Sequence, residues 1–500
     1  MDNRRFVKYI SYHNRYQEKF RITLKVDIMK SLNRRDFLKT SGGALSTLSV
    51  GCQAGTTPTA KTPPNILVIM TDQQSATMMG CAGNSYVNTP SMDRLAASGV
   101  RFDRAYCTAP VCVPSRFSMM TGRMPSEIAM RNNEVAHIDK IPDHILQQGM
   151  GHLFRRAGYD AAFGGKEHLP KMDVKDLGFD YICRDERDEL ATTCAEYISQ
   201  RRDRPFLLFA SFINPHDICY MAIRDFASTD HARQLINNGV VEVETLDRSL
   251  QLPEGVSREE FFKSHCPPLP ANFEPQQDEP EAIRDMLAMR PFRKNARDKW
   301  SDERWRLHRW AYHRLTDMVD VQIGRVMDAL RESGKERDTL VIFTSDHGDM
   351  DSSHRMEHKT TFYDEACRVP LIVSRPGMIP SGVTDSDNLM STGLDLYPTL
   401  CDAAGIEMPD DLQGVSMLPV AEGKSPDTER DFVRVENEIG RMIVTRDYKY
   451  MLHDEGENRE QLIDLLNDPG EMRNAIDDSD LKFNRDNHRK LFESAFGSSG

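Results

Sequence analysis

Four short, continuous apolar runs recur along the chain, at residues 65–70, 205–213, 340–344 and 369–374. Such runs are expected of strands that are buried on both faces of a sheet. Between them, apolar residues recur at intervals of three and four, most clearly over residues 312–331, which predicts an amphipathic helix ended by Gly334. A shorter helix is predicted over residues 91–98. Strands that alternate with helices predict an α/β fold, with a large, mixed and mostly parallel sheet sandwiched by helices.

The pattern of apolar residues changes towards the C-terminus. Short alternating runs at 432–436 and 442–452, and a helix-like stretch at 481–496, predict a small antiparallel subdomain packed on the main one. We therefore expect a main domain over residues 65–425 and a small C-terminal α+β subdomain over residues 426–500.

Residues 1–52 differ from the rest of the chain in charge, with eleven Lys and Arg against four Asp and Glu, a net charge of +7. Arg34 and Arg35 precede a weakly apolar run of small residues that ends at Cys52, an arrangement that resembles a twin-arginine export signal. The run is too short and too polar to span a bilayer. We therefore expect an exported protein, periplasmic or at the cell surface, and a basic tail is the alternative.

Three details refine this expectation. Cys52 stands where a lipid-attachment cysteine would, although Ser49 occupies a position at which such signals usually carry leucine. Met29 lies just before the paired arginines, so the start at Met1 and a start at Met29 are both open. Residues 53–64 form a linker rich in Thr and Pro. Membrane attachment is expected only through a lipid on Cys52.

Composition narrows the class of protein. The chain has 500 residues, of which 39% are hydrophobic and 28% are charged, and this excludes a polytopic membrane protein, a disordered chain and a collagen-like repeat. The net charge is −13, and about −20 without residues 1–52, which argues against nucleic acid as a partner. Ten cysteines are too few for a disulfide scaffold, and they indicate no pairing.

Polar residues follow three of the predicted strands at the point where each strand ends. Asp72 and Gln73 follow the first run, Asn-Pro-His-Asp at 214–217 follows the second, and Asp346 and His347 follow the third. Ligands of open α/β sheets bind outside the carboxyl ends of the strands, so we expect these side chains to converge. The two aspartates, the glutamine and the histidine offer mainly oxygen, which favours one divalent cation, Ca²⁺ before Mg²⁺ or Mn²⁺.

Two simpler interpretations of these residues stay open. Each polar cluster, taken singly, is compatible with an ordinary turn after a strand. His354 and His358 have the i and i+4 spacing that serves zinc on a helix, although no third ligand is evident nearby.

The sharpest motif is Cys-Val-Pro-Ser-Arg at residues 112–116, followed by Met-Met-Thr-Gly-Arg at residues 119–123. Read with the preceding strand, these motifs resemble the sulfatase family, part of the alkaline phosphatase superfamily. The resemblance covers residues 63–475. It includes further motifs at 164–168 (Gly-Gly-Lys-Glu-His), 214–217, 345–348 (Ser-Asp-His-Gly), 357–359 (Glu-His-Lys), 447–450 (Asp-Tyr-Lys-Tyr), 460–462 (Glu-Gln-Leu) and 468–471 (Asp-Pro-Gly-Glu).

The resemblance implies a specific nucleophile. In this family a maturation enzyme oxidises the cysteine of the motif to formylglycine, so Cys112 is implied as the nucleophile. An unmodified thiolate could attack sulfur, but it would leave a thiosulfate ester with no internal way to break down. An aldehyde hydrate avoids this, because one hydroxyl attacks sulfur and the second later expels sulfate. One hydroxyl is also implied to rest on the metal beside Asp72, Gln73, Asp346 and His347.

The resemblance also implies roles for five other residues. Arg116, Lys166 and Lys359 would neutralise the sulfate oxygens as charge develops. His168 would deprotonate the remaining hydroxyl, and His216, with Lys359, would protonate the leaving alcohol oxygen. Simpler alternatives are a helix-surface cation for Arg116, solvated loop positions for Lys166 and His168, and an ion pair for Lys359 with a nearby carboxylate, Glu357 or Asp364.

Two positions depart from the family pattern. Gln73 stands where members often carry a second aspartate, and His347 stands where many carry asparagine. Both can coordinate a cation, but the glutamine removes one negative charge from the expected ligand set.

The expected activity is hydrolysis of a sulfate ester, with an extracellular sulfated saccharide as the substrate and with the maturation enzyme and the export machinery as partners. One alternative is a phosphodiesterase or phosphonate monoester hydrolase of the same superfamily. Another is a non-catalytic lipoprotein that binds sulfated glycans. We expect residues 124–160 and 220–300 to determine which substrate is chosen. Within the second range, residues 251–297 are rich in Pro, Glu and Asp, which predicts a surface excursion. In this region a solvated face is expected for Arg224, Arg233, Arg290 and Arg297.

Overall fold

The computed structural model describes residues 63–426 and 428–497, and residues 62–500 form one compact unit. The predicted export signal, Cys52 and most of the linker lie outside the described residues. Within the described part, no helix has the length and apolar character needed to cross a membrane. Because residues 62–500 form one unit, the boundary at residue 425 stays a prediction.

An eight-stranded sheet runs through the centre of the molecule in the order β5-β4-β6-β1-β7-β8-β2-β9. Neighbours pair in parallel from β5 to β7, whereas β8 is antiparallel to β7 and to β2, so the predicted mixed, mostly parallel sheet is confirmed. The four apolar runs form β1, β6, β7 and β8. The bounds are β1 (Asn65–Asp72), β2 (Val100–Phe102), β4 (Asp160–Gly165), β5 (Asp180–Cys183), β6 (Phe206–Pro215), β7 (Thr339–Ser345), β8 (Leu371–Ser374) and β9 (Val383–Asp385).

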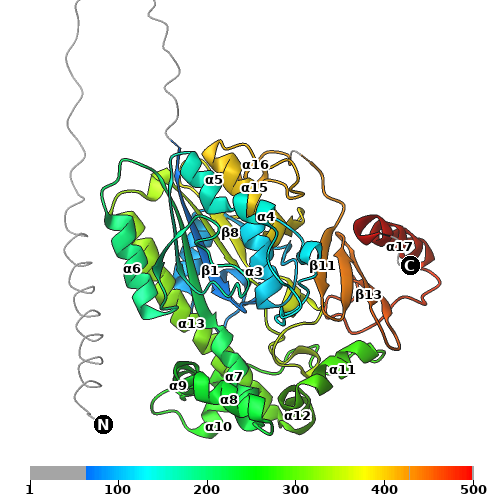
Figure 1. Ribbon diagram of the computed structural model, residues 1–500. Coiled ribbons are helices and arrows are strands. Elements are labelled where there is room, and N and C mark those ends of the chain that lie inside the picture. The colour runs from blue at the N-terminus through cyan, green and yellow to red at the C-terminus, as the bar shows by residue number, and fades with distance from the viewer. Residues whose placement is uncertain (1–62, 427, 498–500) are drawn as a thin grey trace, which may run out of the picture. The chain divides into compact units, whose positions relative to one another are not determined.

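Helices cover both faces of this sheet, because its central strands are apolar on both sides (Figure 1). Ile66 and Val68 of β1 face a core that includes α3 (Cys112–Thr121), α5 (Met150–Arg156) and α15 (Thr392–Ala404). Leu67 and Ile69 face the other core, which is built with α2 (Pro90–Ala97), α6 (Asp188–Ser199) and α13 (Asp302–Glu332). The predicted sandwich is therefore confirmed. Helix α13 begins ten residues before its predicted start, at a Ser301 cap that accepts a hydrogen bond from the Arg304 amide.

Residues 216–300 form a cluster of short helices below one end of the sheet in Figure 1. The prediction of a surface excursion at 251–297 missed the helices within that range, because each is short; α11 and α12, the longest of them, have nine residues each. The bounds are η3 (His216–Cys219), α7 (Tyr220–Asp225), α8 (Asp230–Asn238), α9 (Val240–Ser249), α10 (Arg258–Glu260), the π-helical turn η4 (Phe261–His265), α11 (Glu281–Met289) and α12 (Pro291–Lys299).

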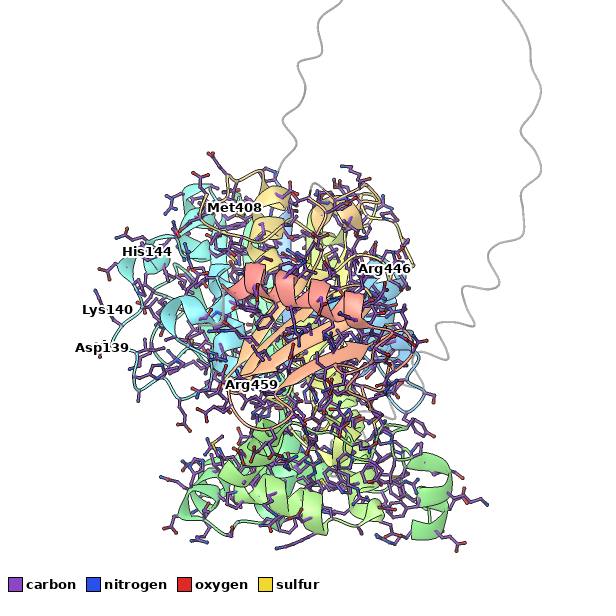
Figure 2. The ribbon with its side chains drawn as sticks, turned by 90° about the vertical axis from the view of Figure 1, so that its right-hand side faces the viewer. Asp139, Lys140, His144, Met408, Arg446 and Arg459 are labelled. Atoms are coloured by element: carbon purple, nitrogen blue, oxygen red, sulfur yellow. The ribbon has the colours of Figure 1, made fainter. Side chains whose placement is uncertain are left out.

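The C-terminal region is a four-stranded antiparallel sheet, as predicted. The run at 442–452 is two strands rather than one, because a turn joins them where Thr445 donates to the Tyr448 carbonyl. Helix α17 lies across one face of this sheet (Figure 2), and its Phe492 packs on Ile443 and Tyr450. The bounds are β11 (Val433–Asn437), β12 (Gly440–Val444), β13 (Tyr448–His453), β14 (Glu460–Asp464) and α17 (Lys482–Phe496).

Smaller elements complete the described fold. A two-stranded parallel sheet joins β3 to β10. The remaining bounds are β3 (Ala105–Tyr106), β10 (Met390–Ser391), α4 (Asp143–Gln147), α14 (Asp364–Cys367), α16 (Leu418–Ala421), η1 (Gly80–Ala82), η2 (Pro125–Ile128), η5 (Glu336–Asp338) and η6 (Ser353–Arg355).

Candidate active site

The carboxyl ends of β1 and β7 meet the N-terminus of α3 at one buried cluster. Asp72 is the last residue of β1, Asp346 and His347 directly follow β7, and Cys112 begins α3. One ligand atom from each of the four lies within 4.8 Å of every other, and all four side chains are buried. The expected convergence of these residues is therefore present in the fold.

Arg116 orients the two carboxylates of this cluster. The spacing of four residues on α3 places its side chain on the same face as Cys112. Its Nη2 donates to Asp72 Oδ2 at 3.0 Å and its Nε donates to Asp346 Oδ2 at 2.8 Å, while Nη1 donates to the Lys166 carbonyl and to Ser211 Oγ. Both Oδ2 atoms are thus occupied. Asp72 Oδ1 lies 3.8 Å from Cys112 Sγ.

Two lysines add positive charge beside Cys112. Lys166 Nζ lies 2.7 Å from Asp72 Oδ2, and Lys359 Nζ lies 3.1 Å from Cys112 Sγ. Lys166 follows Gly165, whose left-handed φ of 87° and close approach to the Ser211 carbonyl leave no space for a Cβ atom. Lys359 forms no ion pair with Glu357 or Asp364, the two carboxylates that the sequence offered as alternative partners. Both lysines are almost fully buried.

Gln73 is anchored by three neighbours. Its Oε1 accepts from Lys359 Nζ at 2.7 Å and from the Cys219 thiol at 3.1 Å, and its Nε2 donates to Asp349 Oδ2 at 2.6 Å. Its backbone N–H donates to Asp346 Oδ1. The sequence analysis did not single out Asp349 as a partner, although it ends the Asp-His-Gly-Asp stretch. Burial raises the pKa of Asp349 to about 7.

His347 presents one ring nitrogen to the cluster. Its Nδ1 lies 2.9 Å from the Gly348 carbonyl, which can only accept, so Nδ1 carries the proton and the neutral ring has its lone pair on Nε2. That Nε2 lies 3.2 Å from Cys112 Sγ. Burial lowers the pKa of His347, but the charge of Asp346 outweighs it and the net direction is upward.

The surrounding charges stabilise an anion at position 112. Burial and the Asp72 carboxylate oppose ionisation of the Cys112 thiol, but Lys359, His347 and Lys166 outweigh them and hold its pKa well below the ordinary value. Burial also opposes ionisation of Asp72, and the charge of Lys166 is the largest of those that nevertheless hold its pKa low. The cluster therefore favours a negatively charged group at this position.

The two predicted acid–base histidines lie differently. His216 begins η3 directly after β6, and its buried Nδ1 has no hydrogen-bond partner among the described residues. Burial and the charge of Lys166 hold its pKa well below the ordinary value. His168 is exposed, has a left-handed φ of 45°, and makes no hydrogen bond or ion pair with the described residues. The charges of the cluster therefore act on the pKa of His216, whereas His168 lies at the surface.

Side chains of the C-terminal sheet hold the segment that follows Lys359. Asn437 Nδ2 donates to the Thr360 carbonyl at 2.7 Å, and Lys449 Nζ donates to the Phe362 carbonyl at 3.0 Å. The buried Lys449 also pairs with Glu471 at 2.7 Å. The sequence analysis included Lys449 and Glu471 only as parts of tail motifs, and it did not single out Asn437.

Other candidate groups have ordinary structural partners. His354 stacks on Tyr363 with ring centroids 3.8 Å apart, and η6 ends at Arg355, so His354 and His358 do not share a helix. The four arginines expected on a solvated face all form ion pairs, namely Arg224 with Asp247, Arg233 with Asp230, Arg290 with Glu134 and Arg297 with Glu279.

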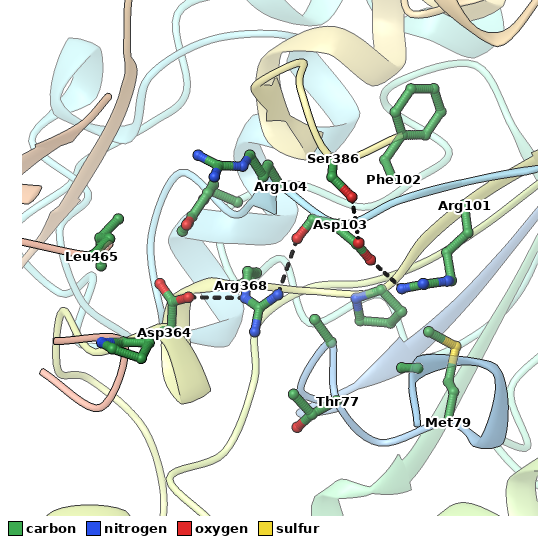
Figure 3. A pocket seen from close by; sticks show the side chains of 15 residues that line it. Thr77, Met79, Arg101, Phe102, Asp103, Arg104, Asp364, Arg368, Ser386 and Leu465 are labelled. Atoms are coloured by element: carbon green, nitrogen blue, oxygen red, sulfur yellow. Dashed lines mark hydrogen bonds and ion pairs between the residues drawn. The ribbon is translucent and has the colours of Figure 1, made fainter. Parts of the chain in front are cut away.

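A separate cavity of about 410 Å³ lies beside β2 and α14 (Figure 3). Arg368 is central in it, 2.9 Å from the Asp364 carboxylate, and donates to the Asp103 carbonyl at 3.1 Å. Asp103 itself pairs with Arg101 and accepts from Ser386. None of the residues of the Cys112 cluster lines this cavity.

Comparison with known proteins points to one family. A family model described as Sulfatase matches residues 64–406, and one described as N-sulphoglucosamine sulphohydrolase, C-terminal, matches residues 352–494. A Delta 4,5-hexuronate-2-O-sulfatase of Bacteroides thetaiotaomicron is 29% identical over 468 residues, which cover 88% of this chain and 90% of the relative.

Solved structures share the architecture. The structure of a 2-O GAG sulfatase has a TM-score of 0.72 at 28% identity and covers 87% of this chain and 92% of its own. A phosphonate monoester hydrolase of Agrobacterium radiobacter has a TM-score of 0.66 at 23% identity, covering 86% and 95%, and shares the fold.

Proposed function

Because the chain belongs to the sulfatase family and is a hydrolase that acts on sulfate esters, we propose that it releases inorganic sulfate from a sulfated saccharide. The observation that carries the proposal is the buried cluster around Cys112, with the Lys359 ammonium 3.1 Å from its sulfur. The relative that is named for a hexuronate supports a saccharide. Because the chain is acidic overall, its net charge repels an anionic substrate. The attraction must therefore come from the local cations Lys166 and Lys359.

The donor atoms of the cluster fit one divalent cation, which we propose to be Ca²⁺. Asp72 and Asp346 supply carboxylate oxygens, His347 supplies the lone pair of Nε2, and position 112 supplies an oxygen once the cysteine is formylglycine. Gln73 could join this set only by turning its Oε1 away from Lys359 and Cys219. When bound, the cation would lower the pKa of the nucleophile and stabilise negative charge on the sulfate group.

Formylglycine made from Cys112 is the proposed nucleophile, and its hydrate supplies one hydroxyl that attacks sulfur and one that later expels sulfate. Lys166 and Lys359 place positive charge where the sulfate oxygens gain negative charge. His216 then donates a proton to the leaving alcohol. A sulfate ester would offset the lysine charge that lowers the pKa of His216, so that the imidazole can carry this proton. His168, exposed at the surface, is the proposed base for the release step.

Export is part of the proposal. The paired arginines at 34 and 35 direct the chain out of the cytoplasm, a maturation enzyme converts Cys112, and a lipid on Cys52 is the proposed route to membrane attachment. An exported location suits a substrate that is an extracellular sulfated saccharide.

The test is sulfate release from a panel of sulfated saccharides, using protein matured in its native host, with Cys112→Ser as the inactive variant. Peptide mass spectrometry should find an aldehyde at position 112, and Cys401→Ser, a buried cysteine in α15, should leave activity unchanged. Unmodified cysteine in active protein would contradict the proposed nucleophile. Faster turnover of phosphonate or phosphate esters with the same leaving group would favour the phosphonate hydrolase alternative. Saccharide binding without any sulfate release would favour the glycan-binding lipoprotein.

A further inference from the structure

Helices α11 and α12 bring Arg293 against the segment that leads into Lys359. Arg293 Nη1 lies 3.7 Å from Met286 Sδ. Met286 packs in one apolar cluster with Met350 and Met356. The Met350 amide donates to the His358 carbonyl at 2.7 Å, so this cluster supports the chain next to Lys359.

Arg293 is a half-buried cation without a carboxylate partner. It forms no ion pair with any described residue, and its Nε is buried without an acceptor. The neighbouring arginines differ, since Arg290 lies 2.9 Å from Glu134 and Arg297 lies 2.8 Å from Glu279. Burial lowers the pKa of Arg293 despite the opposing charge of Glu357, but a guanidinium stays ionised at neutral pH. An unpaired charge of this kind is costly to keep and calls for an explanation.

Glu357 is the matching anomaly. Both of its carboxylate oxygens are buried and lack a hydrogen-bond partner among the described residues, and the residue is 3% exposed. Burial raises the pKa of Glu357 to about 8, so its carboxyl keeps a proton at neutral pH, and it forms no ion pair with Arg293. Glu357 therefore does not neutralise Arg293, and the guanidinium stays available to another anion.

A short chain of contacts joins this region to the reactive cluster. Glu357 Oε2 lies 3.7 Å from His358 Nδ1, and that nitrogen lies 3.0 Å from Cys219 Sγ. The Cys219 thiol donates to Gln73 Oε1 at 3.1 Å, the same oxygen that accepts from Lys359. The segment at 356–359 therefore runs from the apolar cluster beside Arg293 to Lys359, which makes a second anionic group of the saccharide a candidate partner for the guanidinium.

We propose that Arg293 binds a second anionic group of the substrate, a carboxylate or a further sulfate, next to the sulfate ester that is hydrolysed. This inference rests on the proposed sulfatase function and adds that the preferred saccharide is at least doubly anionic. Arg293 forms part of a specificity site, and it takes no part in breaking the ester bond. A guanidinium suits this role because it can donate two parallel hydrogen bonds to either oxyanion.

The experiment compares saccharides that carry the same reactive sulfate ester and differ only in the second group: a carboxylate, its reduced neutral alcohol, or a second sulfate. In the wild type, we expect kcat/KM to be about 10- to 100-fold higher for an anionic second group. Arg293→Gln should reduce that preference to about one, mainly through KM, and the substrate that loses most identifies the natural group. Arg290→Gln, which removes an already paired arginine, is the matched control and should keep the wild-type preference.

Two further measurements keep the result interpretable. The thermal midpoint of Arg293→Gln should equal or exceed that of the wild type, because an unpaired charge is removed. Binding of the same saccharides to Cys112→Ala by calorimetry should show the same dependence on Arg293. Equal losses on neutral and anionic substrates, or no preference in the wild type, would overturn the inference. Arg293-dependent binding of anionic saccharides that yield no sulfate with the matured wild type would instead contradict the proposed function alone.

Discussion

The ammonium nitrogen of Lys359 lies 3.1 Å from Cys112 Sγ, although the two residues are 247 positions apart in the chain. Lys359 also donates to Gln73 Oε1, which fixes the direction of its side chain. Its charge is the largest of those that favour ionisation of Cys112. This contact joins the proposed nucleophile to a segment that the C-terminal sheet holds in place.

Replacement of this lysine should remove stabilisation of the developing charge. We expect Lys359→Met to lower kcat by about 100- to 1,000-fold, a typical cost for one such donor. In protein made without the maturation enzyme, the same substitution should raise the pKa of the Cys112 thiol, measured as the pH dependence of alkylation. Lys140→Met, at an exposed ion pair with Asp143, is the control. An unchanged alkylation profile would show that Lys359 does not act on position 112.

Metal removal should abolish activity and lower stability. We expect chelation to inactivate the wild type and added Ca²⁺ to restore it. When the free Ca²⁺ concentration is 100 times its Kd, bound Ca²⁺ should stabilise the fold by about 2.7 kcal/mol, measured by thermal unfolding. His347→Ala should weaken this response, whereas His144→Ala, at an exposed position of α4, should retain it. If no divalent cation shifts the wild-type midpoint, the proposed metal site is wrong.

The buried Glu357 should make stability depend on pH. Burial raises its pKa from 4.5 to about 8, so in this window the unfolded chain releases a proton that the folded chain keeps. Wild-type stability should therefore decline as pH rises from about 4.5 to about 8, by at most about 1.4 kcal/mol per pH unit from this group. Glu357→Gln has no carboxyl that titrates at this position. Its thermal midpoint should therefore rise relative to that of the wild type as the pH increases across that range. The exposed control Glu332→Gln should follow the wild type, and a parallel Glu357→Gln curve would contradict the assignment.

The contact from the C-terminal sheet to the Lys359 segment should matter for both stability and turnover. Asn437→Ala removes the hydrogen bond to the Thr360 carbonyl and leaves that buried oxygen unpaired. We expect a loss of about 1–3 kcal/mol in the free energy of unfolding and a fall in kcat larger than the change in KM. Asn467→Ala, on an exposed turn, should change neither quantity. Full retention of kcat in Asn437→Ala would show that the contact does not position Lys359.

Much of the fold could be predicted from the sequence, because local patterns depend on near neighbours in the chain. The apolar run at β1 sends Ile66 and Leu67 to opposite cores, and this alone implies a sheet covered on both faces. Helices α11 and α12 could not be predicted in this way, because nine residues show an apolar spacing over little more than two turns, and the surrounding Pro, Glu and Asp favour a loop.

For the site, the sequence by itself determined which chemical groups are available: the Cys112–Arg116 motif, the strand-end residues Asp72 and Asp346, and the family they resemble. Only the tertiary structure decided how these groups are paired. It directs Arg116 to both carboxylates, turns Gln73 towards Lys359, and leaves Arg293 without an ion-pair partner among the described residues. The physical reason is that these contacts join side chains far apart in the chain. Their distances are therefore set by how strands and helices pack, which no local pattern records.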